Sequence, residues 1–291
     1  MNALAASLKS GNRRAISKAI SLVESTKPEH EALALRLLNQ LKARDNDVIE
    51  KRVDKATQHV SIGISGPPGA GKSSVIEELG CCLVEQGHKV AVLAIDPSSE
   101  SSGGAILGDK TRMPRLSSLN NAFIRPSPSR GSLGGVSRST ADAMTICFEA
   151  GFTHVLVETV GVGQSELAVS NLVDCFTLIL PPVGGDELQS IKRGITEVAD
   201  IVLVNKADGP TRMAAMRAAA TFKATLGLRP SPRQSWSTAV LPISAHTGAG
   251  FDTLLKIFEE YFERMSESGE LAEVRVQRQQ RRGFSKMALP S

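Results

Sequence analysis

Residues 60–74 read Val-Ser-Ile-Gly-Ile-Ser-Gly-Pro-Pro-Gly-Ala-Gly-Lys-Ser-Ser, and this stretch decides the fold. Its first six residues are apolar or small, as is typical of a buried strand. A Gly-x-x-x-x-Gly-Lys-Ser loop follows directly and opens a helical segment. Glycines let successive backbone N–H groups converge on an anion, and the helix N-terminus adds its positive end. The stretch therefore predicts a phosphate-binding loop.

The residues of this loop have separate expected roles toward a nucleotide. Lys72 is expected to reach the β- and γ-phosphates, which makes it a candidate catalytic residue. The Ser73 hydroxyl is expected to bind Mg²⁺. The candidate phosphate-binding residues are Gly66, Pro67, Pro68, Gly69, Ala70, Gly71, Lys72, Ser73 and Ser74.

Short, almost wholly apolar segments continue along the chain and alternate with helical stretches. This alternation predicts an α/β fold, a P-loop domain whose mostly parallel, doubly wound sheet has helices on both faces. Ligands of such sheets collect beyond the carboxyl ends of the strands. The predicted strands are Val60–Ser65, Val90–Ile95, Ala122–Arg125, His154–Glu158, Phe176–Leu180, Ile201–Asn205 and Val240–Ile243.

Three regions are expected along the chain. Residues 1–58 form a small helical region, in which Pro28 marks a helix start. Residues 59–266 form the P-loop domain, which ends with a helix over Phe251–Met265 and contains a long irregular stretch, 96–135, of a kind that is usually functional. Residues 267–291 form a basic tail, either a solvated end or a contact for nucleic acid or an acidic protein face.

Composition narrows the class of protein. The chain has 291 residues, 41% hydrophobic and 22% charged, which is ordinary globular composition. The net charge of +4 is too small to indicate the class of partner. Aromatic residues make up only 4%, which argues against a surface that stacks nucleic-acid bases. No apolar run is long enough to span a membrane. We expect neither a nucleic-acid nor a membrane partner. Four cysteines without paired spacing indicate reduced thiols, hence a cytoplasmic protein, or a mitochondrial-matrix protein in a eukaryote. The acid-free residues 1–23 form either a first helix or a presequence.

A second motif selects the base. Asn205-Lys206-Ala207-Asp208 follows a predicted strand, and the Asp208 carboxylate can accept hydrogen bonds from a purine that carries N1–H and a 2-amino group. Adenine has neither donor, so it would leave a buried polar group unsatisfied. Ser244-Ala245-His246 follows another strand, and Ser244 and Ala245 can offer N–H groups to the guanine oxygen. The candidate base-pocket residues are Asn205, Lys206, Asp208, Ser244, Ala245 and His246.

Three acids lie where metal and γ-phosphate chemistry is expected. Asp96, Asp109 and Glu158 are, with Ser73, the candidate Mg²⁺ ligands, because a hard cation takes oxygen ligands. The alternative for each acid is that it only caps a helix or loop. Glu158-Thr159-Val160-Gly161 stands in the place of Asp-x-x-Gly, which makes Glu158 and Gly161 candidate catalytic residues.

The residue after this motif bears on the rate of GTP hydrolysis. Val162 stands where a fast GTPase places a water-orienting Gln, and Gln164 comes two residues later. We therefore expect slow intrinsic turnover that a partner accelerates. Basic side chains in the long loop either neutralise transition-state charge or are simply solvated: Lys110, Arg112, Arg115 and Arg130.

Taken together, these blocks resemble the MeaB family, also called ArgK, of methylmalonyl-CoA mutase-associated GTPases. The resemblance runs from about residue 8 to 265. The matching stretches are Ala15–Ala34, Gly66–Ser74, Asp96–Met113, Phe123–Val136, Val157–Glu166, Gly184–Ile191 and Asn205–Gly209.

The resemblance implies a function that spacing does not. It implies a GTPase that binds an adenosylcobalamin-dependent acyl-CoA mutase, gates cofactor loading and protects the mutase, with 161–166 as a mobile loop that reports the nucleotide state. It also implies a homodimer, although members usually continue into a Trp-containing helical region that helps form the dimer, whereas this chain stops at Ser291. The alternatives are a metal-delivery GTPase and a kinase of a transport system.

Overall fold

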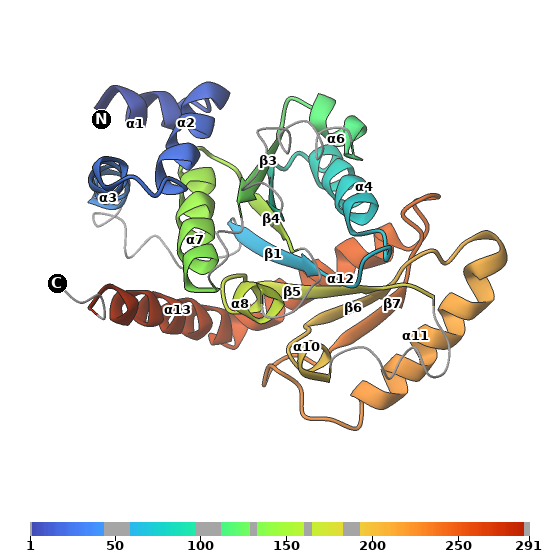
Figure 1. The fold of residues 1–291 in the computed structure, drawn as a ribbon. Helices are drawn as coiled ribbons and strands as arrows, with labels where there is room; N and C mark the ends of the chain where they lie inside the picture. Colours follow the sequence, from blue (N-terminus) through green and yellow to red (C-terminus); the bar gives the residue numbers. More distant parts are fainter. Residues whose placement is uncertain are drawn as a thin grey trace. The chain divides into compact units, whose positions relative to one another are not determined.

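The fold is that of a computed structural model, which describes residues 2–43, 59–96, 112–128, 133–159, 165–182 and 193–287 (Figure 1). Its strands are β1 (Val60–Ser65), β2 (Val90–Asp96), β3 (Ala122–Pro128), β4 (His154–Glu158), β5 (Cys175–Leu180), β6 (Ile201–Val204) and β7 (Ala239–Pro242). They form a seven-stranded sheet in the order β3-β2-β4-β1-β5-β6-β7. Every pair whose register is defined is parallel, as predicted.

The helices of the described residues follow the strands in the expected alternation. They are α1 (Asn2–Lys9), α2 (Arg13–Val23), α3 (Pro28–Ala43), α4 (Lys72–Glu85), α6 (Pro114–Ser118), α7 (Leu133–Glu149), α8 (Ser165–Ser170), α10 (Arg193–Glu197), α11 (Arg212–Leu226), α12 (Phe251–Glu267) and α13 (Glu270–Met287), with a 3-10 turn η3 (Gly209–Thr211). None of the described helices is long and apolar enough to span a membrane.

The chain divides into two compact units. The first comprises Met1–Ser61 and Leu83–Val157. Within it α2 buries Ile16 and Ile20 on a face that packs against α3 and α7, and the Asn12 side chain caps its N-terminus by accepting from two backbone N–H groups. Apolar residues spaced by three or four explain this burial.

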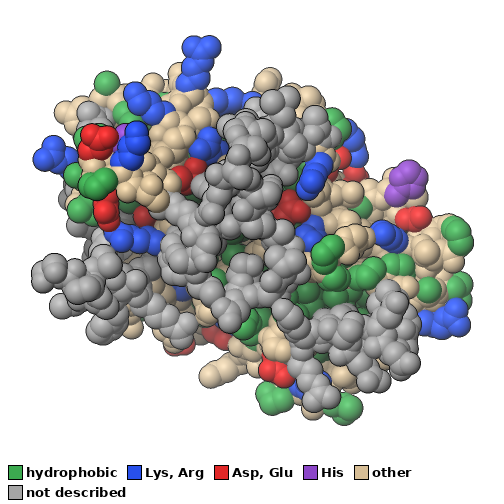
Figure 2. All heavy atoms as spheres, viewed as in Figure 1, with side chains coloured by type: hydrophobic (Ala, Val, Ile, Leu, Met, Phe, Trp, Pro, Cys, Tyr) green, Lys and Arg blue, Asp and Glu red, His purple; other side chains and the backbone are tan. Residues whose placement is uncertain are grey.

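The second unit comprises Ile62–Cys82 and Glu158–Ser291. It contains β1 from Ile62 onward, together with β5 and β6, and all three strands are wholly buried; α11 packs against β6 and β7. The outer face of α11 is exposed, and Figure 2 shows hydrophobic and cationic side chains next to each other along the edge where Figure 1 places this helix.

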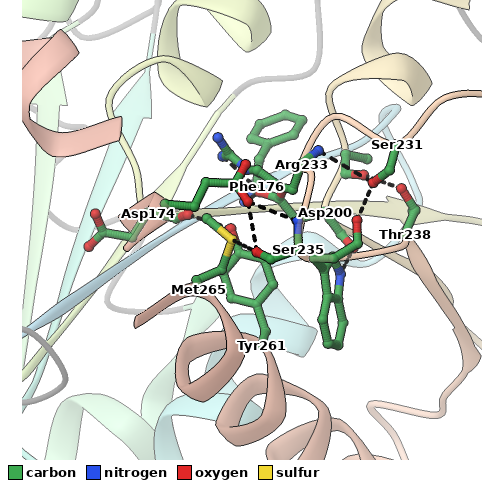
Figure 3. Close-up of polar contacts among 12 residues, drawn as sticks. Asp174, Phe176, Asp200, Ser231, Arg233, Ser235, Thr238, Tyr261 and Met265 are labelled. Atoms are coloured by element: carbon green, nitrogen blue, oxygen red, sulfur yellow. Dashed lines mark hydrogen bonds and ion pairs between the residues drawn. The ribbon is translucent and has the colours of Figure 1, made fainter. Parts of the chain in front are cut away.

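A buried polar network ties the start of β6 to the segment before β7. The Asp200 carboxylate accepts from the Phe176 N–H at 2.7 Å and from Arg233 Nε at 2.9 Å, and the Trp236 indole N–H donates to the Asp200 carbonyl at 2.9 Å (Figure 3). The Asp200 carboxylate raises the pKa of Arg233 above its usual value, against the effect of burial. Charge-assisted bonds of this kind fix the loop before β7.

The structure differs from the sequence prediction mainly at the C-terminus. The residues expected as a solvated tail form α13, in which Leu271 is buried. Arg275 Nη2 and Arg278 Nη1 each lie 2.8 Å from an oxygen of the buried Asp174 carboxylate. The basic residues are therefore partly used to hold this helix. The predicted division at residues 58 and 266 stays a prediction.

Strand and helix bounds differ by smaller amounts. Two strands, His154–Glu158 and Val60–Ser65, have the predicted bounds. In addition, β3 continues to Pro128 and β6 ends at Val204, one residue before Asn205. The stretch 96–135 contains α6 besides β3. None of the four cysteines, all of which the structure describes, forms a disulfide, and burial raises the pKa of Cys147 to about 12.

Candidate nucleotide-binding site

The phosphate loop joins β1 to α4, as the motif predicts, and two of its glycines have no substitute. Gly66 has φ 153° and Gly71 has φ 90°, conformations that L side chains rarely adopt. A Cβ at Gly66 would lie 2.1 Å from the Ile179 carbonyl oxygen, and one at Gly71 would lie 2.5 Å from Asn205 Nδ2. Both glycines therefore allow close packing of the loop as well as its turn.

Lys72, the first residue of α4, folds back over the loop. Its Nζ donates to the carbonyl oxygens of Gly66 at 2.8 Å and of Pro67 at 3.3 Å. These contacts hold an ammonium group at the mouth of the loop, where a bound phosphate would compete for it. This position fits the expected role of Lys72.

Ser73 and Glu158 meet, although 85 positions separate them in the sequence. The Ser73 hydroxyl donates to Glu158 Oε1 at 3.1 Å, and both side chains are half-buried. Two hard oxygen donors side by side fit a Mg²⁺ ion, which prefers oxygen ligands and retains several waters. Of the predicted metal ligands, these two are brought together by the structure.

The side chain of Asn205 connects the phosphate loop to residues 244–246, the second segment of the predicted base pocket and hereafter the guanine loop. It is buried, its Nδ2 donates to the Ala70 carbonyl at 2.9 Å, and its Oδ1 accepts from the Ala245 N–H at 3.1 Å. One amide thus satisfies an acceptor of one loop and a donor of the other. Sequence reasoning placed Asn205 in the base pocket but missed this connection, because the two loops are far apart in the chain.

Several of the groups that were expected to contact guanine form hydrogen bonds with other residues of the protein. Asp208 Oδ2 accepts from the Ser244 hydroxyl, so this carboxylate lies against residues 244–246; its expected contact with the base stays a prediction. The N–H groups of Ser244 and Ala245, which were expected to face the guanine oxygen, donate instead to the Ala249 carbonyl and to Asn205 Oδ1. His246 is exposed beside them.

Thr211 holds the backbone of residues 205–208, the first segment of the predicted base pocket. Lys206 has φ 61°, a left-handed conformation that is uncommon for residues other than glycine. The Thr211 hydroxyl donates to the Lys206 carbonyl at 2.6 Å and to the Asp208 carbonyl at 3.0 Å, and the Ala207 N–H donates to the Ile243 carbonyl at 2.9 Å. Thr211 was missed, although a Thr in the turn that precedes a helix is a recognisable signal.

Several predicted residues are not placed by the structure. Asp109 and Gly161 lie outside the described residues, as does most of the loop 161–166. Asp96 ends β2, and only its backbone is described. Among the described residues, no group of three or more His, Cys, Asp or Glu side chains has the arrangement of a metal site.

The family model of the methylmalonyl Co-A mutase-associated GTPase MeaB matches residues 16–288. This chain belongs to the MeaB family. The match spans the phosphate loop, the Glu158 strand and the guanine motif, and it extends through α13. The GTPase class predicted from the sequence is confirmed, and the assignment of individual site residues stays a prediction.

Relatives and a solved structure agree with this family. The chain is 48% identical over 262 residues to the mouse methylmalonic aciduria type A homolog, mitochondrial. The aligned region makes up 90% of this chain and 63% of that protein. It is 48% identical to a putative GTPase of Caulobacter vibrioides, of which it covers 77%. A crystal structure titled LAO/AO transport system kinase superposes with a TM-score of 0.80 at 32% identity, over 98% of this chain and 82% of that one. The α/β P-loop fold is thereby confirmed.

Proposed function

We propose that this chain binds and hydrolyses GTP with Mg²⁺ and uses its nucleotide state to chaperone an adenosylcobalamin-dependent acyl-CoA mutase. The observation that supports the nucleotide part is the Asn205 amide, which connects a phosphate loop to a guanine loop across two hydrogen bonds. The names of the family and of the mouse relative support the mutase part. We also propose that the protein works in the cytoplasm, or in the mitochondrial matrix in a eukaryote, and acts as a homodimer.

The site residues would act on GTP as follows. Backbone N–H groups of the loop around Gly66 and Gly71 bind the phosphates, and Lys72 leaves its two carbonyl partners for the β- and γ-phosphates. Ser73 and Glu158 would hold Mg²⁺, which neutralises developing phosphate charge when bound. Asp208 accepts from the guanine N1–H and 2-amino group. Turnover is slow, because Val162 stands where a water-orienting Gln is needed.

Nucleotide selectivity tests the first half of this proposal. The fluorescence of labelled GDP, displaced by GTP or ATP, is expected to give at least about 100-fold preference for GTP, because adenine leaves the Asp208 carboxylate unsatisfied. Asp208→Asn is expected to remove most of this preference, and Asp252→Asn on the exposed start of α12 is the matched control. Equal displacement by ATP, or an Asp208→Asn variant with unchanged preference, would contradict the proposal.

The second half is tested with the purified acyl-CoA mutase of the same organism. Its affinity for this protein, and its rate of loading with adenosylcobalamin, are expected to differ between the GDP-bound and GTP-bound forms. No difference in either quantity would count against a chaperone role. Transfer of labelled γ-phosphate to a protein acceptor would favour the transport-kinase alternative instead.

A further inference from the structure

The outer face of α11 carries an apolar stripe. Met213 is 61% and Met216 is 47% exposed, and Ala220 and Ala224 are exposed on the same side. Steps of three and four residues align these positions along one face of a helix. The opposite face, which packs against β6 and β7, is buried: Ala215, Ala218, Ala219 and Phe222. The helix is therefore apolar on both faces, and only one of them is covered by its own unit.

Cations border this stripe. Arg212, Arg217 and Lys223 are exposed, and none of the ion pairs among the described residues involves them. A rotation of about 100° per residue places Arg217 on one side of the stripe and the other two on the opposite side. The sequence of α11, RMAAMRAAATFKATL, contains no acid. In contrast, Arg233 of the same unit pairs with Asp200 at 2.9 Å.

We propose that this α11 surface, made of Met213, Met216, Ala220 and Ala224 with Arg212, Arg217 and Lys223, docks an acidic, apolar-centred patch of the acyl-CoA mutase. The inference rests on the proposed function, since that function supplies the partner. Complementary charge argues for an acidic occupant. Arg217 Nε donates to the Met213 carbonyl at 3.3 Å, but the described residues supply no carboxylate to any of the three cations, and cations on both sides of the stripe would steer and orient an acidic partner. An apolar side chain of the partner would bury the two methionines.

The residue types favour a protein occupant over a lipid surface. Met and Arg are enriched at the buried centres of protein interfaces, and the flexible Met side chain adapts to a partner's shape. Helices that lie in a membrane interface carry Trp, Phe or Leu on the apolar face, whereas the exposed stripe of α11 carries Met and Ala. An anionic membrane is accordingly an outcome that the experiment must separate.

The surface lies close, along the chain, to residues 205–208, the first segment of the predicted base pocket. η3 connects Asp208 directly to α11, and the Thr211 hydroxyl bonds the carbonyls of Lys206 and Asp208 within this turn. A partner seated on the first turn of α11 would therefore lie next to the segment that selects guanine. This position suits a surface through which a bound protein senses the nucleotide state.

The experiment measures the affinity of the full chain for the purified mutase by surface plasmon resonance in about 0.1 M salt. The double variant Met213→Glu/Met216→Glu is expected to weaken binding at least tenfold, since it puts two anions in front of an acidic, apolar-centred patch. Arg217→Glu is expected to weaken it severalfold and to reduce its salt dependence. The matched control is Leu35→Glu on α3, where Leu35 is 43% exposed, and its affinity is expected to stay within twofold. Retained binding of labelled GDP checks that each variant is folded.

Four results would overturn the inference. Wild-type affinity in the Met213/Met216 double variant would reject the α11 surface while leaving the proposed function intact. An equal loss in Leu35→Glu would remove its specificity. A wild-type chain that does not bind the mutase in any nucleotide state would end both the inference and the mutase part of the proposed function. Binding to phosphatidylserine vesicles that depends on the two methionines, with mutase affinity unchanged, would identify a membrane surface instead.

Discussion

Replacing Asn205 by Ala tests whether one amide couples the phosphate loop to the guanine loop. In the native protein Nδ2 donates to the Ala70 carbonyl at 2.9 Å, and Oδ1 accepts from the Ala245 N–H at 3.1 Å. Ala70 is fully buried and Ala245 is half-buried. The substitution removes both bonds and leaves the Ala70 oxygen without its partner.

The magnitude follows from this burial. A buried polar group that loses its partner costs about 1–3 kcal/mol, and a half-buried one that water can reach costs about 0.5–1.5 kcal/mol. Together they predict that the free energy of unfolding falls by about 1.5–4.5 kcal/mol. With a urea dependence of roughly 2–3 kcal/mol per molar, the unfolding midpoint falls by about 1 M. GDP affinity is expected to fall at least about tenfold, because neither loop is then held for its part of the nucleotide.

Urea unfolding and displacement of labelled GDP measure the two effects. Asn171→Ala is the matched control, because the exposed Asn171 amide also donates to a backbone carbonyl, that of Leu167, at 2.9 Å. Its loss is expected to cost less than about 0.5 kcal/mol, as for most surface substitutions. An Asn205→Ala protein that unfolds within about 0.5 kcal/mol of wild type and binds GDP equally well would refute the coupling.

Three other predictions follow from the geometry. Gly71→Ala is expected to reduce GDP affinity at least tenfold, because its Cβ would lie 2.5 Å from Asn205 Nδ2. In Gly69→Ala the new Cβ would have no atom within 4 Å, so only the strain at φ 79° remains, and the expected loss of GDP binding free energy is about 1 kcal/mol. Displacement of labelled GDP compares the two variants. Burial and two nearby imidazoles lower the pKa of His154 to about 3. Below about pH 6.5 the His154 side chain of the unfolded chain binds a proton, whereas that of the native state stays neutral until about pH 3. The free energy of unfolding therefore falls between about pH 6.5 and 3, by up to about 1.4 kcal/mol per unit, and His154→Gln flattens this slope in urea titrations. Asp174→Asn removes the negative charge that pairs with Arg275 and Arg278 of α13. The free energy of unfolding is expected to fall by about 3 kcal/mol, and α13 is expected to become sensitive to trypsin. An unchanged digestion pattern would argue against this anchoring of α13.

Much of the fold follows from local sequence signals. The apolar run Val60–Ser65 before a glycine-rich loop predicts a buried strand, and the structure places β1 on those residues. The ends of other strands are less well predicted, because a strand ends where its neighbour stops pairing: β6 ends at Val204, opposite Pro242 of β7. Asn205 follows the last residue of β6; its backbone N–H still donates to the Leu180 carbonyl of β5 at 2.9 Å, while its side chain reaches both loops.

The sequence by itself determined the class of protein: a loop of glycines before a lysine and a serine, a strand ahead of it, and a guanine-selecting motif beyond. Each of these signals is local, because it depends on backbone conformation and residue type over fewer than ten positions. Only the tertiary structure decided that Ser73 donates a hydrogen bond to Glu158, that Asn205 donates one to the Ala70 carbonyl, and that basic residues of α13 pair with Asp174. These contacts join positions 85, 135 and 101 residues apart, and no pattern along the chain specifies them, since they depend on which strands the sheet brings side by side.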